Sequence, residues 1–347
     1  MKLKKLLYLS SLILICFGAC KKDDATPVDQ TPPVVTPPYV ADNSFKIVAY
    51  MPSYKDPSTV ADFKYKLITH LFYAFLNPNP IGDGSLMALP QQPRFFAVQQ
   101  KAKANNVKFG ISISGSNSIF VTIAASATAR TTFVNNIVTF AKNNNLDGVD
   151  MDWEYPSTTN GSADNFTLLM KELSEALHKN NKFLSAAVTP GVYAGGIKDG
   201  IRQEVFQYVD FFNIMQYDGP NYDPAEPLNH ASYKMSVKSL DVYLIEKELP
   251  RVKAIVGIPL YGKDATPSPN TKSIAYRDIE AAGADVTLNL ATVNGVDYGF
   301  NGTTLVKQKA QLAKDRANGI MFWEFAHDSN TANSLIKAAN DQLGRAY

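Results

Sequence analysis

Cysteine is scarce in this chain of 347 residues, which holds only Cys16 and Cys20. Both lie within the first twenty residues, so the remaining chain can form neither a disulfide nor a thiolate metal site, and it offers no cysteine nucleophile. An excess of charge of one sign is lacking too, because 34 Lys and Arg residues face 32 Asp and Glu residues, for a net charge of +2. This balance gives no argument for a nucleic-acid partner.

Signals for a cofactor are also missing. No Gly-x-Gly-x-x-Gly follows the first expected strand and no glycine-rich phosphate loop occurs, so no nucleotide is implied. The histidines show no His-Glu-x-x-His or similar ligand spacing, so we expect no metal and no other cofactor. We interpret each of the four as structural: His70, His178, His230 and His327.

The N-terminus has the pattern of a targeting signal. A basic start with three lysines precedes an apolar run at residues 6–17, which is too short to span a membrane, and Gly18-Ala19-Cys20 follows. The arrangement resembles a bacterial lipoprotein signal, which implies that residues 1–19 are removed and that Cys20 is lipidated. The resemblance implies a lipid-anchored protein of the bacterial cell envelope, at the outer membrane and exposed at the surface. An ordinary secretory signal is the alternative.

A linker and one folded domain are expected after the signal. Residues 20–44 carry five prolines among Thr, Val and Asp without apolar periodicity, which favours an extended, semi-rigid spacer. The whole chain is 45% hydrophobic and 19% charged, which is enough apolar material for a large core. We expect a single domain over residues 45–347 and a monomer.

The fold class follows from an alternation of short apolar runs with segments of helical periodicity, such as residues 164–177 and 130–142. Eight such units predict an α/β fold, a parallel (β/α)₈ TIM barrel whose strands are buried on both faces. A doubly wound open sheet is the alternative, but its glycine fingerprint is missing. The expected strands are residues 46–51, 67–76, 108–114, 148–154, 184–189, 211–217, 254–260 and 319–323.

Three carboxylates recur at every second position of the fourth expected strand. Strand alternation places Asp150, Asp152 and Glu154 on one face and the intervening apolar residues, including Trp153, on the other. Ionising three adjacent carboxylates is unfavourable, so at least one should have a raised pKa, as a general acid requires. A calcium loop would need glycine where Tyr155 stands, and a buried ion network would need a cation that the segment lacks.

The segment Asp147-Gly148-x-Asp150-x-Asp152-x-Glu154 resembles the signature of the family 18 glycoside hydrolases, the chitinase family. Segments at the other seven expected strands are similar to the family as well, including residues 215–218, 257–262 and 319–324. The resemblance covers essentially all of residues 45–347.

The resemblance implies a substrate-assisted retaining mechanism on β-1,4-linked N-acetylglucosamine, in which the 2-acetamido oxygen of the sugar is the nucleophile. Glu154 would be the general acid and base, Asp152 would orient the acetamido group, Asp150 would tune Asp152, and Tyr217 would brace the acetamido oxygen. Family positions that contact the sugar correspond to Tyr50, Phe75, Met215, Asp218 and Trp323. Trp153 points away from the acids by strand parity, and we expect it in the core.

Departures from the family pattern bear on the substrate. Ser114-Gly115-Ser116-Asn117 stands where many chitinases continue Gly-Gly-Trp, so an aromatic platform is missing. About 55 residues separate Gly262 from Gly319, too few for a full α+β insertion domain, so we expect a shallow cleft. The expected partner is a polysaccharide or glycan that contains N-acetylglucosamine. An endo-β-N-acetylglucosaminidase that cuts the N-glycan core and a non-catalytic glycan-binding protein remain the alternatives to a chitinase.

Overall fold

The computed structural model describes residues 38–268 and 270–347. The predicted signal peptide, the lipidation site Cys20 and the linker up to residue 37 lie outside the described residues. Within the described part of the chain, no helix is both long and apolar enough to cross a membrane.

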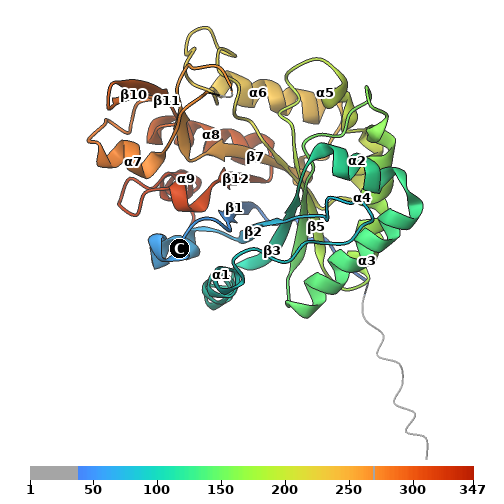
Figure 1. Cartoon of the computed structure of the whole chain (residues 1–347). Coiled ribbons are helices and arrows are strands. Elements are labelled where there is room, and N and C mark those ends of the chain that lie inside the picture. Colours follow the sequence, from blue (N-terminus) through green and yellow to red (C-terminus); the bar gives the residue numbers. More distant parts are fainter. Residues whose placement is uncertain (1–37, 269) are drawn as a thin grey trace, which may run out of the picture. The chain divides into compact units, whose positions relative to one another are not determined.

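Eight parallel strands close into a barrel (Figure 1), in the order β1-β12-β7-β6-β5-β4-β3-β2. The predicted (β/α)₈ fold is therefore confirmed, and each barrel strand overlaps an expected apolar run. These strands are nearly continuous apolar segments because side chains on both of their faces are buried. The barrel strands are β1 (Lys46–Pro52), β2 (His70–Leu76), β3 (Lys108–Ser114), β4 (Gly148–Asp152), β5 (Phe183–Val188), β6 (Phe211–Ile214), β7 (Ala254–Pro259) and β12 (Gly319–Trp323).

Helices surround these strands and cover their outward-facing side chains (Figure 1). In α4 (Ser162–His178), Phe166, Leu169 and Leu173 recur at helical spacing and are buried against the barrel, as the periodicity predicts. The other helices are α1 (Gln92–Ala104), α2 (Asn117–Ala125), α3 (Ala127–Asn143), α5 (Gly196–Gly200), α6 (Tyr233–Asp241), α8 (Thr303–Arg316) and α9 (Leu335–Leu343).

A small insertion separates β7 from α8. It holds one short helix, α7 (Tyr276–Ala281), and a four-stranded antiparallel sheet in the order β10-β11-β8-β9. Its strands are β8 (Tyr261–Lys263), β9 (Ser273–Ala275), β10 (Leu290–Val293) and β11 (Val296–Gly299). The expectation that a full insertion domain would not fit is consistent with this reduced version, although the sequence interpretation did not identify its strands.

The register of β4 determines where its acidic side chains lie. Asp150 pairs with Ser112 of β3 on one side and with Ser185 of β5 on the other. Even-numbered residues of β4 face the barrel interior, whereas Trp153, just beyond the strand, packs outward in the core against Phe120 with ring centroids 5.3 Å apart. The expected core position of Trp153 is confirmed. These inward-facing positions place Asp150 and Asp152 toward the C-terminal end of the barrel, where barrel enzymes carry out their chemistry.

Candidate active site

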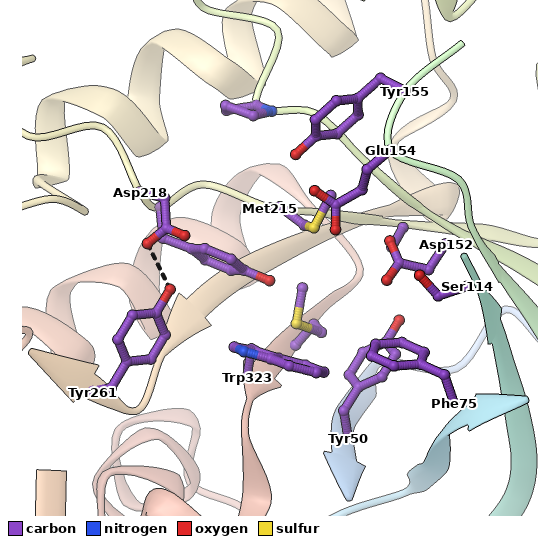
Figure 2. A pocket seen from close by; sticks show the side chains of 14 residues that line it. Tyr50, Phe75, Ser114, Asp152, Glu154, Tyr155, Met215, Asp218, Tyr261 and Trp323 are labelled. Carbon is purple, nitrogen blue, oxygen red and sulfur yellow. Dashed lines mark hydrogen bonds between the residues drawn. The ribbon is translucent and has the colours of Figure 1, made fainter. Parts of the chain in front are cut away.

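A pocket of about 200 Å³ opens at the C-terminal ends of the barrel strands. Figure 2 shows the carboxylates of Asp152 and Glu154 on one wall and Asp218 across the pocket from them. Eight of the nine residues predicted for the site line it, and the ninth, Asp150, lies beneath. The lining residues are Tyr50, Phe75, Ser114, Asp152, Glu154, Tyr155, Ala187, Pro190, Met215, Tyr217, Asp218, Tyr261, Met321 and Trp323.

Asp150 is fully buried and lies inside a cage of hydrogen-bond donors. Its Oδ2 accepts from the hydroxyls of Tyr50 and Ser112, both at 2.8 Å, and its Oδ1 accepts from Ser185 at 2.6 Å and from Asn213 Nδ2 at 3.2 Å. Burial raises the pKa of Asp150, and the donors oppose part of that rise. No cation from residues 38–268 or 270–347 contacts this carboxyl group, so the donors fix its orientation without neutralising it.

Asp152 lies one inward position closer to the pocket and is only 5% exposed. Burial, followed by the neighbouring charges of Glu154 and Asp150, raises the pKa of Asp152 well above its ordinary value, while a hydrogen bond from Ser114 lowers it. Its Oδ1 has no hydrogen-bond partner among the described residues. The pKa rise expected for the carboxylate row thus falls on the two aspartates, and the free oxygen of Asp152 is available to a ligand in the pocket.

Glu154 stands beyond the last residue of β4 and is exposed. The expected strand over residues 148–154 ends at Asp152, so Glu154 lies in the loop, yet its side chain still reaches the same wall (Figure 2). The peptide bonds Ala74–Phe75, Glu154–Tyr155 and Trp323–Glu324 are cis, and each contains at least one residue of the pocket lining. Glu154 is the carboxyl group of the row that solvent and a large ligand can both reach.

Aromatic rings form the wall at the end of β12. The indole of Trp323 stacks on Phe75, with ring centroids 5.6 Å apart and planes at 22°, and contacts the Tyr50 ring edge-on at 5.7 Å. Met215 lies beside this cluster, and Tyr217 lines the pocket near the acids. Desolvation and the nearby Asp152 raise the pKa of Tyr217, which keeps its hydroxyl protonated. A flat apolar surface bordered by hydroxyl and carboxyl groups suits the mixed faces of a sugar ring.

Asp218 follows β6 with a left-handed backbone, φ 64°, and is held by three neighbours. Its Oδ1 accepts from the Tyr261 hydroxyl at 2.6 Å and lies 2.8 Å from Lys263 Nζ and 3.2 Å from His230 Nδ1. Burial alone would raise the pKa of Asp218, but the contacts with His230, Lys263 and Tyr261 outweigh burial and lower it. Asp218 is therefore a fixed negative charge on the opposite side of the pocket from Asp152, whose pKa is raised.

Sequence reasoning missed the residues that support these side chains. Ser112, Ser185 and Asn213 occupy inward positions on β3, β5 and β6, so strand parity could have found them. Tyr261, Lys263 and His230 left no comparable signal, because they reach Asp218 through loops and the insertion. Among the described residues, no group of three or more His, Cys, Asp or Glu side chains could hold a metal ion.

The fold and the pocket define a class: a (β/α)₈ barrel with an acidic, aromatic-lined site at the C-terminal face. Residues 46–328 match the model of the glycosyl hydrolases family 18, and the chain belongs to this family.

Curated relatives carry chitinase names. The chain is 27% identical to a class V chitinase of Arabidopsis thaliana over 330 residues, which cover 81% of this chain and 85% of the relative. It is also 27% identical to probable chitinase 10 of Drosophila melanogaster over 269 residues, which cover 67% of this chain but only 12% of that much longer relative.

Solved structures share the fold. A class V chitinase mutant from Cycas revoluta in complex with (GlcNAc)₃ superposes with a TM-score of 0.74 at 22% identity, covering 86% of this chain and 100% of that one. A chitinase-like agglutinin from Robinia pseudoacacia superposes with a TM-score of 0.70 at 24% identity, covering 85% of this chain and 98% of that one.

Proposed function

We propose that the chain hydrolyses β-1,4 glycosidic bonds at N-acetylglucosamine residues of chitin or chito-oligosaccharides. The observation that carries this proposal is the row of three carboxyl groups, Asp150, Asp152 and Glu154. Asp150 is buried in a cage of hydrogen-bond donors beneath the pocket, Asp152 and Glu154 line the aromatic pocket above it, and Glu154 is exposed. The chitinase relatives and the (GlcNAc)₃ complex of the Cycas revoluta chitinase support the same substrate class.

The proposed reaction is substrate-assisted and retaining. Glu154 gives its proton to the glycosidic oxygen as the bond from this oxygen to the anomeric carbon breaks. The 2-acetamido oxygen bonds to that carbon, and an oxazolinium ion forms as the leaving sugar departs. Glu154 then takes a proton from a water molecule whose oxygen attacks the anomeric carbon. This attack opens the oxazolinium ring and restores the acetamido group, and Glu154 is protonated again.

The buried aspartates support this step electrostatically. Asp152 uses its unpartnered Oδ1 to accept from the acetamido N–H, which orients the acetamido oxygen for attack. In this proposal Asp150 and Asp152 share one proton, which moves toward Asp150 as positive charge develops on the oxazolinium and leaves a negative Asp152 beside it. The Tyr217 hydroxyl donates a hydrogen bond to the acetamido oxygen in the same arrangement.

The rest of the pocket binds the sugar in this proposal. Trp323 forms the apolar floor under the reacting ring, with Phe75 stacked on it and Tyr50 against its edge. Met215 fills the space beside that floor, and Asp218 offers a fixed acceptor to sugar hydroxyl groups.

Glu154→Gln tests the mechanism, because the amide keeps the shape of the side chain but cannot donate an acidic proton. We expect turnover of chito-oligosaccharides to fall by about 10³-fold or more while their binding, measured by calorimetry, is retained. Glu175→Gln on the surface of α4 is the matched control and should leave turnover unchanged. A thiazoline analogue of the oxazolinium should inhibit the wild-type protein. Substantial turnover by Glu154→Gln would contradict the proposed acid and base.

The same assay distinguishes two alternative hypotheses for the function. Cleavage of an N-glycosylated protein but not of chito-oligosaccharides would make the chain an endo-β-N-acetylglucosaminidase. The fold shared with the Robinia pseudoacacia agglutinin favours testing a glycan-binding role as well, which binding without cleavage of either substrate would support.

We also propose that Cys20 carries a lipid and tethers the protein to the bacterial outer membrane. The basic and apolar start of the sequence supports this anchor. Metabolic labelling with a fatty-acid analogue should mark the wild-type chain and not a Cys20→Ser variant. Equal labelling of the two would contradict the anchor.

A further inference from the structure

His230 is completely buried between two residues of the pocket wall, although its sequence context suggested only a structural histidine. Its Nε2 lies 3.2 Å from the carbonyl oxygen of Tyr261, which can only accept a hydrogen bond. Nε2 therefore carries a proton, and Nδ1 faces Asp218, where it lies 3.1 Å from the backbone nitrogen and 3.2 Å from Oδ1 of the carboxylate. One imidazole thus holds the backbone of Asp218 on one side and the backbone of Tyr261 on the other.

These two contacts determine where the Asp218 carboxylate points. The Tyr261 ring packs against His230 with centroids 5.0 Å apart, and its hydroxyl donates to Asp218 Oδ1. The N–H of Gly219 donates to the carbonyl of His230 at 2.9 Å, so the turn that follows Asp218 is attached to the same residue. The left-handed backbone of Asp218 is unfavourable for a residue with a side chain and needs such contacts to persist.

The loop that carries His230 is anchored from behind by buried polar groups. Lys309 of α8 is fully buried, and its Nζ donates to the carbonyl of Ala231 at 2.6 Å and to Asn301 Oδ1 at 2.7 Å. The amide of Asn301 donates in turn to Ala231 O at 3.0 Å and to Asn229 Oδ1 at 3.1 Å. The residues on both sides of His230 are therefore fixed to the helix that follows the insertion.

We propose that His230 is a positioning residue of the site, which fixes Asp218 and Tyr261 at the pocket and ties them through Asn229, Asn301 and Lys309 to α8. The activity measurements that test this role rest on the proposed function. The imidazole does not touch the pocket and acts on a bound sugar only through Asp218 and Tyr261.

Two conservative variants separate the two hydrogen bonds. His230→Asn keeps an acceptor near the place of Nδ1, whereas His230→Gln keeps a donor near the place of Nε2, and His230→Ala removes both. If Asp218 is what His230 positions, kcat/KM for chito-oligosaccharides should fall on the order of 100-fold in His230→Ala, recover partly in His230→Asn, and stay low in His230→Gln. His178→Ala is the matched control, because His178 also contacts an aspartate, Asp210, at 3.0 Å but at the opposite end of the barrel.

A double-mutant cycle distinguishes positioning from a general loss of structure. In an Asp218→Ala background, the further substitution His230→Asn should lower kcat/KM by less than about threefold, because the group that it positions is already gone. Independent losses that multiply in the double variant would overturn the proposal, as would equal activities of the Asn and Ala variants.

Nitrogen NMR of the four histidine rings tests the geometry without any turnover. We expect one ring to carry a proton on Nε2, with signals that disappear in His230→Asn and an Nδ1 signal that shifts in Asp218→Ala. An Nε2 without a proton in that ring would overturn the proposal. Wild-type protein that cleaves no N-acetylglucosamine oligomer but shows this protonated Nε2 would refute the proposed function and leave the positioning of Asp218 intact.

Discussion

Asp152 is a carboxyl group whose ionisation the surrounding protein opposes. Burial comes first among the causes, and the charges of Glu154 and Asp150 add to it. A carboxyl group with a raised pKa contributes stability that is fully present below its unfolded value and is lost as the pH rises through its folded value. Asp152 therefore stabilises the fold least at neutral and alkaline pH.

We predict that Asp152→Asn stabilises the protein while it impairs turnover. Removing the charge should raise Tm by about 2 °C or more at pH 8, and this difference should shrink as the pH falls and approach zero below about pH 3, where Asp152 is protonated in both states. Thermal unfolding of both proteins across this pH range measures the effect. Asp315→Asn, which removes one exposed carboxylate of α8, should show no such pH-dependent gain. A destabilised Asp152→Asn at pH 8 would contradict the assigned direction of the pKa shift.

Strand parity accounts for most of the site that could be predicted from the sequence. It aligned Asp150, Asp152 and Glu154 on one wall, because alternation along a strand depends only on local geometry. It could not supply the contacts of Asp218 with His230 and Tyr261, which lie 12 and 43 residues further along the chain. Those contacts depend on how a loop and an insertion pack together, which no local pattern encodes.

The strands of the insertion were not predicted from local sequence patterns either. Its strands have three or four residues each, too few for an apolar run or an alternation to stand out. One signal was present and was not used: Asn294-Gly295 joins β10 to β11 with φ of 51° and 76°. Asn-Gly between short apolar segments is a strong indicator of a two-residue β-hairpin turn, because both positions require positive φ. The barrel strands, with four to seven mostly buried residues, were all predicted.

Close packing of β11 against the loop that carries His230 leads to a prediction for this element. A Cβ added at Gly299 would lie 1.9 Å from the carbonyl oxygen of Leu228, so the loop or the strand must move. We expect Gly299→Ala to weaken binding of chito-oligosaccharides by about tenfold or more through the displaced loop. KM and calorimetric affinity measure this change.

The control for Gly299→Ala is a glycine of the same sheet. Gly295→Ala strains the hairpin turn, where φ is 76°, but a Cβ there would meet no atom within 4 Å. It should lower Tm and leave KM close to that of the wild type. If both variants changed KM equally, the loss would reflect the stability of the insertion and not the position of the loop.

The two ends of the barrel perform separate tasks. The pocket lies at the C-terminal ends of the strands, while the chain enters the described body at the opposite end. There Tyr39 stacks on His178 with ring centroids 4.0 Å apart and planes at 8°, and Asn318 Nδ2 donates to the carbonyls of Asn43 and Ser44 at 3.1 Å. Burial, then the adjacent Asp210, raises the pKa of the Tyr39 hydroxyl. The segment that precedes β1 is thus fastened to the body before the first strand begins.

This separation predicts that stability and activity can be changed independently. Tyr39→Ala should lower Tm by about 2 to 4 °C, because it removes an aromatic stack of about 1 kcal/mol, and should leave kcat/KM unchanged. Tyr39→Phe keeps the stacked ring and should retain most of the stability, which would assign the effect to the ring and not to the hydroxyl. Differential scanning calorimetry and oligosaccharide turnover on the same preparations provide both readouts. A loss of kcat/KM in Tyr39→Ala at temperatures where the protein stays folded would mean that the two ends are coupled through the barrel, and the linker would then influence catalysis as well as stability.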